Sequence, residues 1–135
     1  MVELNPFEIF GLKCNFNIDR MQLITQFAKL QQECHPDAPN SSYDKALNIT
    51  YSFEILKDDI KRGEAILKIY GIEMNDVPIE QEFLIQLIES EDEEAQELYE
   101  KQKEILQTFQ EINENNVAFF AVEFLKYKYL QSKLF

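Results

Sequence analysis

The chain has 135 residues, of which 45% are hydrophobic and 28% are charged, so it can bury a core and is not a disordered tail. Its formal net charge is −12, which excludes most nucleic-acid binders because these need a cationic surface to displace counterions. The three glycines are too far apart to build a phosphate-binding loop. No apolar run is long enough to cross a bilayer, so we expect neither nucleic acid nor membrane as a partner.

The N-terminal ten residues are neither basic nor followed by a long apolar region, and they do not resemble a secretory signal or an organellar presequence. The two cysteines, Cys14 and Cys34, form no C-x-x-C pair and are interpreted as reduced thiols. The expected location is therefore a bacterial cytoplasm, with the mitochondrial matrix, for a mature chain, as the second expectation.

Two helices are predicted in the first quarter of the chain. A short one lies between Asn5, which can cap it, and Gly11, which ends it, with Pro6 in its first turn. A longer amphipathic helix starts at Asp19. It must end near Cys34, because a residue that precedes proline is pushed out of the α region.

Two more helices complete the first half. One is predicted to begin near Ser41 or Ser42 and to break at residues 57–59. A shorter one then follows and ends at Gly71. Residues 72–78 have weak periodicity and several turn-forming residues, so they are predicted to be a linker.

The second half is predicted to contain three helices. The first starts near Pro78, and the second starts at Ser90, where Glu93 completes a capping-box pattern. A seam at alternating spacings of three and four residues, typical of a bundle helix, consists of Ala95, Leu98, Gln102, Ile105, Phe109 and Ile112. A turn at 113–116 leads to an apolar last helix at 117–134.

No stretch alternates with a period of two, so no strand is expected and the predicted fold class is all-α. The predicted organisation is a helical hairpin domain at 1–71, the linker at 72–78, and an up-and-down bundle of about three helices at 79–135. Most of the negative charge falls in the bundle, which favours encounter with a basic protein surface.

The tripeptide His35-Pro36-Asp37 contains the only histidine of the chain and lies between two predicted helices. Pro36 prevents the helix from continuing, and Asp37 can bond nearby amides in an Asx-type turn. His35 is then presented at the tip of the loop as a polar recognition group. The alternatives are an ordinary turn histidine, or a metal or nucleophile site that includes Cys34, although residues so close along a chain rarely converge on one point.

The loop and its flanking sequences, NPFEIFGL before and ILKDDIKRGEAI after, resemble a J-domain, the co-chaperone module that stimulates DnaK-type ATPases. The second half, with YGIEMNDVP, EFLIQLIE and YKYLQSKLF, is similar to the HscB family of iron–sulfur co-chaperones. This resemblance covers essentially the whole chain. It implies that the chain is not an enzyme, because the hydrolytic site belongs to the partner, and that it needs no cofactor or metal.

The resemblance also implies two sets of contact residues. A chaperone ATPase of the HscA/DnaK type would be bound through His35, Pro36, Asp37, Arg20 and Lys29. An IscU-type scaffold protein would be bound through Leu84, Ile85, Ile88, Glu89, Asp92 and Tyr129. The apolar members of the second set could instead be core residues, but the 83–88 segment is apolar over more of its helix surface than one core face needs. The acidic run at 89–104 is expected to be both a solvated face and part of this surface.

Two function classes follow. One is an adaptor that binds the scaffold, delivers it to the chaperone and stimulates the chaperone's ATPase during iron–sulfur cluster assembly and transfer. The other is a helical interaction protein, or a general J-protein, with a weakened or inactive J-domain, which the scarcity of Lys and Arg at 20–34 would favour. An enzyme is a distant third.

Overall fold

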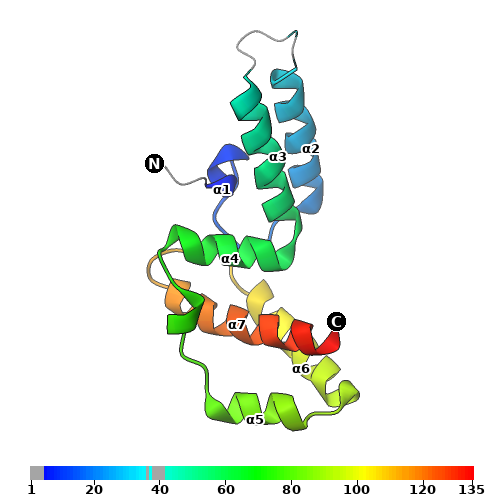
Figure 1. Cartoon of the computed structure of the whole chain (residues 1–135), viewed down its shortest axis with the longest axis vertical. Helices are drawn as coiled ribbons and strands as arrows, with labels where there is room; N and C mark the ends of the chain where they lie inside the picture. The colour runs from blue at the N-terminus through cyan, green and yellow to red at the C-terminus, as the bar shows by residue number, and fades with distance from the viewer. Residues whose placement is uncertain (1–4, 36, 38–41) are drawn as a thin grey trace.

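The computed structural model describes residues 5–35, 37 and 42–135, and over these residues it is all-helical, as predicted. Seven α-helices and one 3-10 turn follow one another in this described part of the chain (Figure 1): α1 Pro6–Ile9, α2 Arg20–Glu33, α3 Tyr43–Lys57, α4 Asp59–Ile69, η1 Met74–Asp76, α5 Gln81–Glu89, α6 Asp92–Gln107 and α7 Val117–Leu134. Among the described helices, none has the length and apolar character that a bilayer crossing requires.

The helix starts predicted for the first half are confirmed by their caps. The Asn5 side-chain oxygen accepts hydrogen bonds from the amides of Phe7 and Glu8 at 3.0 and 3.3 Å. Asp19 caps α2 in the same way, and Ser42 caps α3. Each of these bonds satisfies an amide that the first helical turn would otherwise leave unpaired.

The capping box predicted at Ser90 and Glu93 is wrong. The Ser90 hydroxyl donates instead to the carbonyl of Leu87 at 3.0 Å, so Ser90 ends α5. The N-cap of α6 is Glu91, and its side chain makes no capping bond. A helix does begin in this segment. The spacing of the sequence does not reveal that the serine hydroxyl can instead bond to a carbonyl of the preceding helix.

The predicted seam of α6 is wrong in part. Leu98 is only half-buried and Ile105 is exposed. The buried residues of α6 are Ala95, Tyr99, Gln102 and Leu106. Phe109 and Ile112 are buried as expected, but they lie in the connection that follows α6. The buried residues are spaced by four, three and four positions. The prediction used the spacings three, four and three, so it selected Leu98 and Ile105 in place of the residues that follow each of them.

The helices are arranged in two parts that meet at α4. The antiparallel pair α2 and α3 forms a hairpin, with α1 packed against α3, and α4 runs across the base of this hairpin (Figure 1). On its other side, α4 packs against α7, which pairs with α6. The hairpin therefore points its tip, where α2 ends and α3 begins, away from the bundle.

An aromatic cluster joins the two parts. The ring of Phe16, in the connection between α1 and α2, lies 5.9, 6.0 and 5.8 Å from the ring centres of Phe120, Phe124 and Tyr127 in α7. A Cβ atom at Gly63 of α4 would lie 2.1 Å from Phe124, so the glycine lets α4 and α7 approach closely.

Polar contacts accompany this packing. The Asn15 side-chain amide donates to the carbonyl of Phe109 at 3.1 Å, and the Asn17 amide donates to that of Leu106 at 2.8 Å. The hydroxyl of Tyr127 donates to the Asp59 carboxylate. These bonds attach the first half of the chain to the end of α6 and to α7. The division into domains at 1–71 and 79–135 remains a prediction, and the packing between these two parts is extensive.

Candidate functional site

The tip of the α2–α3 hairpin carries the residues predicted to contact a chaperone. Helix α2 ends at Glu33 with Cys34 as its C-cap, close to the expected end, and the next residue, His35, has 63% of its side chain exposed. The Asp37 side chain is 93% exposed. Pro36 lies outside the described residues. Both described side chains are therefore accessible to another protein.

A local contact orients the His35 ring. Its Nδ1 atom accepts a hydrogen bond from the Asp37 amide at 3.2 Å, and it lies 3.7 Å from Oδ2 of the same residue. An Nδ1 atom that accepts a hydrogen bond carries no proton, so the neutral ring holds its proton on Nε2. The ring thus offers an N–H donor on the side away from Asp37, as a recognition group requires.

The two cations predicted on α2 are exposed but lie apart. Lys29 is in the last two turns of the helix, near the tip, whereas Arg20 is its first residue. At about 1.5 Å per residue, the 13 positions from Arg20 to Glu33 separate Arg20 from the tip by roughly 20 Å along the helix. Lys29 therefore lies nearer to the tip along the helix than Arg20 does.

Other cations near the base of the hairpin are already engaged. Arg62 donates to the carbonyls of Phe16 and Leu56 at 2.5 and 2.8 Å, and burial lowers the pKa of its guanidinium while Asp59 opposes this shift. Lys57 pairs with Glu54 at 2.8 Å. Arg62 thus has a structural role at the corner between α3 and α4.

The predicted scaffold-binding residues of α5 are exposed, with one correction. Ile85 and Ile88 are 47% and 78% exposed, but Leu84 is half-buried. Phe83 and Leu87 pack against the core. Neighbouring residues on the same short helix thus divide between core and solvent, and Leu84 lies at the boundary.

Contacts with α7 set the orientation of α5. The ammonium of Lys133 donates to the carbonyl of Leu87, and to that of Ser90 at 2.8 Å. The ammonium of Lys126 lies 5.7 Å from the ring centre of Phe83. Tyr129, which is exposed, lies one helical turn before Lys133 and so shares the face of α7 that holds α5.

The acidic members of the predicted set lie just beyond the exposed isoleucines. Glu89 is the last residue of α5 and Asp92 is the first residue of α6, and both are exposed. The structure therefore joins the apolar positions of α5 to an acidic border.

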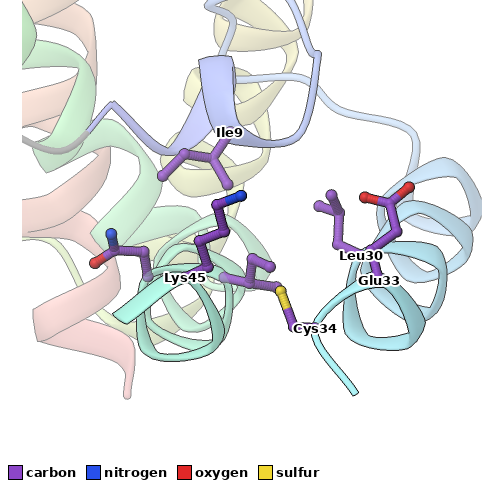
Figure 2. A pocket seen from close by; sticks show the side chains of 7 residues that line it. Ile9, Leu30, Glu33, Cys34 and Lys45 are labelled. Atoms are coloured by element: carbon purple, nitrogen blue, oxygen red, sulfur yellow. The ribbon is translucent and has the colours of Figure 1, made fainter. Parts of the chain in front are cut away.

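A pocket of about 470 Å³, which the sequence did not predict, lies beside the hairpin tip (Figure 2). Its described lining residues come from α1, from the end of α2 and the Cys34 that follows it, and from the start of α3: Ile9, Leu30, Glu33, Cys34, Lys45, Asn48 and Ile49. Most of these positions look like ordinary core or surface residues in the sequence, because nothing in helical periodicity indicates where packing leaves a space.

Comparisons with known proteins relate the chain to HscB-type co-chaperones. No protein-family model matches the chain. A co-chaperone protein HscB homologue from Vibrio cholerae is 40% identical over 80 residues, which cover 53% of this chain and 47% of the relative. One from Haemophilus ducreyi is 40% identical over 73 residues, covering 48% and 42%. The aligned part of the chain thus spans about half the length of the curated relatives it matches.

The similarity in fold extends further. The solved structure of the chaperone HscB from Vibrio cholerae aligns with 96% of this chain and 93% of its own, with a TM-score of 0.64 and 28% sequence identity. The resemblance to HscB-type co-chaperones is thus confirmed, in sequence over the aligned half of the chain and in fold over nearly all of it.

Proposed function

We propose that the chain is a co-chaperone that binds an IscU-type iron–sulfur scaffold and delivers it to a DnaK/HscA-type chaperone, whose ATPase it stimulates. The observation that carries this proposal is the exposed pair His35 and Asp37 at the tip of the α2–α3 hairpin, in a fold shared with HscB from Vibrio cholerae. In this proposal, residues 1–71 act as the J-domain and residues 79–135 hold the scaffold.

The hairpin tip acts by recognition and not by catalysis. The Nε2–H of His35 donates to an acceptor on the chaperone, and the exposed carboxylate of Asp37 accepts from a donor there. Both groups are already accessible, so the tip can bind without rearrangement of the core. The hydrolytic site lies in the partner, which binds ATP.

The scaffold is held by the exposed side of α5. Ile85 and Ile88 present apolar surface to solvent, and such surface on a monomer marks a partner site. Burial of each isoleucine contributes about 1–2 kcal/mol to binding. The acidic border at Glu89 and Asp92, with the acidic face of α6 behind it, favours a partner with a basic surface.

Single-turnover ATP hydrolysis by an HscA-type chaperone tests the function directly. We expect the protein to accelerate hydrolysis, and an IscU-type scaffold added with it to accelerate hydrolysis further. Stimulation that the scaffold does not increase would indicate that the chain is a general J-protein. Absence of stimulation by a folded protein would contradict the proposal.

Calorimetric titration of the scaffold tests the α5 surface. Replacement of Leu84, Ile85 and Ile88 by alanine should weaken binding by about tenfold or more, since their apolar surface is then missing from the interface. The matched control is the double variant Leu47→Ala and Tyr51→Ala, which removes exposed apolar surface from α3 and should leave scaffold affinity unchanged. Unchanged affinity in the folded triple variant would refute this site.

A J-like protein with a weakened chaperone contact is the second candidate. It is favoured by the two cations at the base of the hairpin that are already engaged, since Arg62 is held by carbonyl groups and Lys57 by Glu54. Few exposed charge pairs also mean that stimulation should fall only gently as ionic strength rises. Scaffold binding without any ATPase stimulation would establish this candidate.

A further inference from the structure

The pocket beside the hairpin tip has apolar walls. Ile49 of α3, Leu30 of α2 and Ile9 of α1 line it together with the half-buried thiol of Cys34. Figure 2 shows Ile9 on one side of the space and Leu30 on the other. A close-packed interior leaves few voids larger than a water molecule, whereas this pocket has a volume of about 470 Å³, within the range of about 300–1,000 Å³ that is typical of ligand sites.

Opposite charges flank this apolar space. Lys45 lies on the same side as Ile9, and Glu33 lies on the side of Leu30 (Figure 2). The two side chains make no ion pair with each other in the described part of the chain. A ligand with a net charge would be repelled by one of them. A neutral dipolar group fits both, and a peptide backbone beside an apolar side chain has this character.

We propose that this pocket takes an apolar side chain from an extended segment of the chaperone ATPase, which makes it a determinant of partner specificity. The carbonyl of that segment accepts a hydrogen bond from Lys45, and its amide donates to Glu33. The inference rests on the proposed function, because the occupant is the protein that contacts His35. Its support is continuity: Cys34 lines the pocket, and the next Cα atom in the chain, that of His35, is about 3.8 Å away.

Selective labelling of Cys34 provides the first test. Burial, reinforced by Glu111, raises the pKa of Cys14 to about 11, so this thiol is protonated and unreactive at neutral pH. Benzyl methanethiosulfonate should therefore label Cys34 and fill the pocket, whereas the methyl reagent adds only a small group. We expect the benzyl label to lower the affinity for an HscA-type chaperone by about tenfold and the methyl label to have a much smaller effect. Dithiothreitol should restore binding, and Cys34→Ser should be insensitive to both reagents.

A second variant changes a lining residue of the pocket on α3, away from the loop that carries His35. Lys45→Glu reverses the charge on the α3 side and should weaken chaperone binding by about tenfold. Lys68→Glu makes the same change at an exposed position of α4 and should have little effect. A loss of affinity with the benzyl label alone would mean that the label displaces the His35 loop, and it would overturn the proposal.

His35→Gln separates this inference from the proposed function. If His35→Gln abolishes ATPase stimulation while the benzyl-labelled protein and Lys45→Glu bind like wild type, the pocket proposal fails and the proposed function stands. If the wild-type protein neither binds nor stimulates the chaperone, the proposed function itself fails, and the pocket proposal fails with it.

Discussion

The tip of the α2–α3 hairpin and the contact between α4 and α7 use their polar groups in opposite ways. At the tip, the side chains of His35 and Asp37 lie close to each other and are largely exposed. Between α4 and α7, the hydroxyl of Tyr127 and the carboxylate of Asp59 satisfy each other within the protein. Groups left free at the surface can bind a partner, whereas groups paired inside the protein stabilise it. Substitutions in the two regions should therefore separate function from stability.

The largest effect on stability is expected at Gly63. A Cβ atom there would lie 2.1 Å from the ring of Phe124, which is fully buried and cannot yield freely. Gly63→Ala should lower the free energy of unfolding by about 3 kcal/mol, although alanine in an unobstructed helix would raise it by about 1 kcal/mol. Urea denaturation measures the change, with Lys61→Ala at an exposed position of α4 as the control. A stabilised Gly63→Ala variant would show that α4 and α7 are not closely packed.

Removal of one hydroxyl should have the next largest effect. Tyr127 is buried, and its hydroxyl bonds to Asp59 and, at 2.9 Å, to the hydroxyl of Tyr99. Tyr127→Phe leaves both partners without this bond and should destabilise the fold by about 2 kcal/mol. Tyr129→Phe, at an exposed residue of the same helix, is the matched control and should change stability by less than about 0.5 kcal/mol. Equal denaturation midpoints for the two variants would contradict the role of this bond.

A smaller effect is expected at alkaline pH. Burial, with help from Glu111, raises the pKa of the Cys14 thiol from 9.0 to about 11. Since the folded state favours the neutral thiol, its contribution to stability is complete below pH 9 and is lost as the pH rises from 9 to about 11.

The Cys14→Ser variant isolates this contribution, because serine does not titrate in that range. Between pH 9 and 11, the wild-type protein should lose more stability than the variant in urea titrations. The pKa of Tyr127 is also raised, by burial and its hydrogen bond to Asp59, but that contribution is common to both proteins. Parallel stability curves would show that Cys14 is not buried in this way.

Local signals in the sequence predicted the helices well. The caps at Asn5, Asp19 and Ser42 depend on neighbours within three residues, so their residue types are sufficient to place them. The last helix, at 117–134, was also predicted with its observed bounds. The capping box at Ser90 failed because Ser90 ends α5, where its hydroxyl donates to the carbonyl of Leu87, and the N-cap of α6 is Glu91.

The contact between the two halves could not be predicted. Asn15 bonds to Phe109, which is 94 positions away in the chain, and Phe16 packs on α7. Contacts at such separation leave no periodic trace, and an asparagine in a connection resembles any turn residue. For the candidate site, the exposure of Ile85 and Ile88 was predicted correctly, but the half-burial of Leu84 was not. The contact roles of these residues remain predictions.

The central claim is that His35 is a recognition group and not a structural one. His35→Gln, measured in parallel by single-turnover ATPase stimulation and by urea denaturation, tests this claim most directly. We expect stimulation of the chaperone to be abolished while the free energy of unfolding changes by less than about 0.5 kcal/mol, because the side chain is 63% exposed and its partner is its own loop. Full stimulation by the variant, or a loss of stability that accounts for the loss of stimulation, would contradict the account.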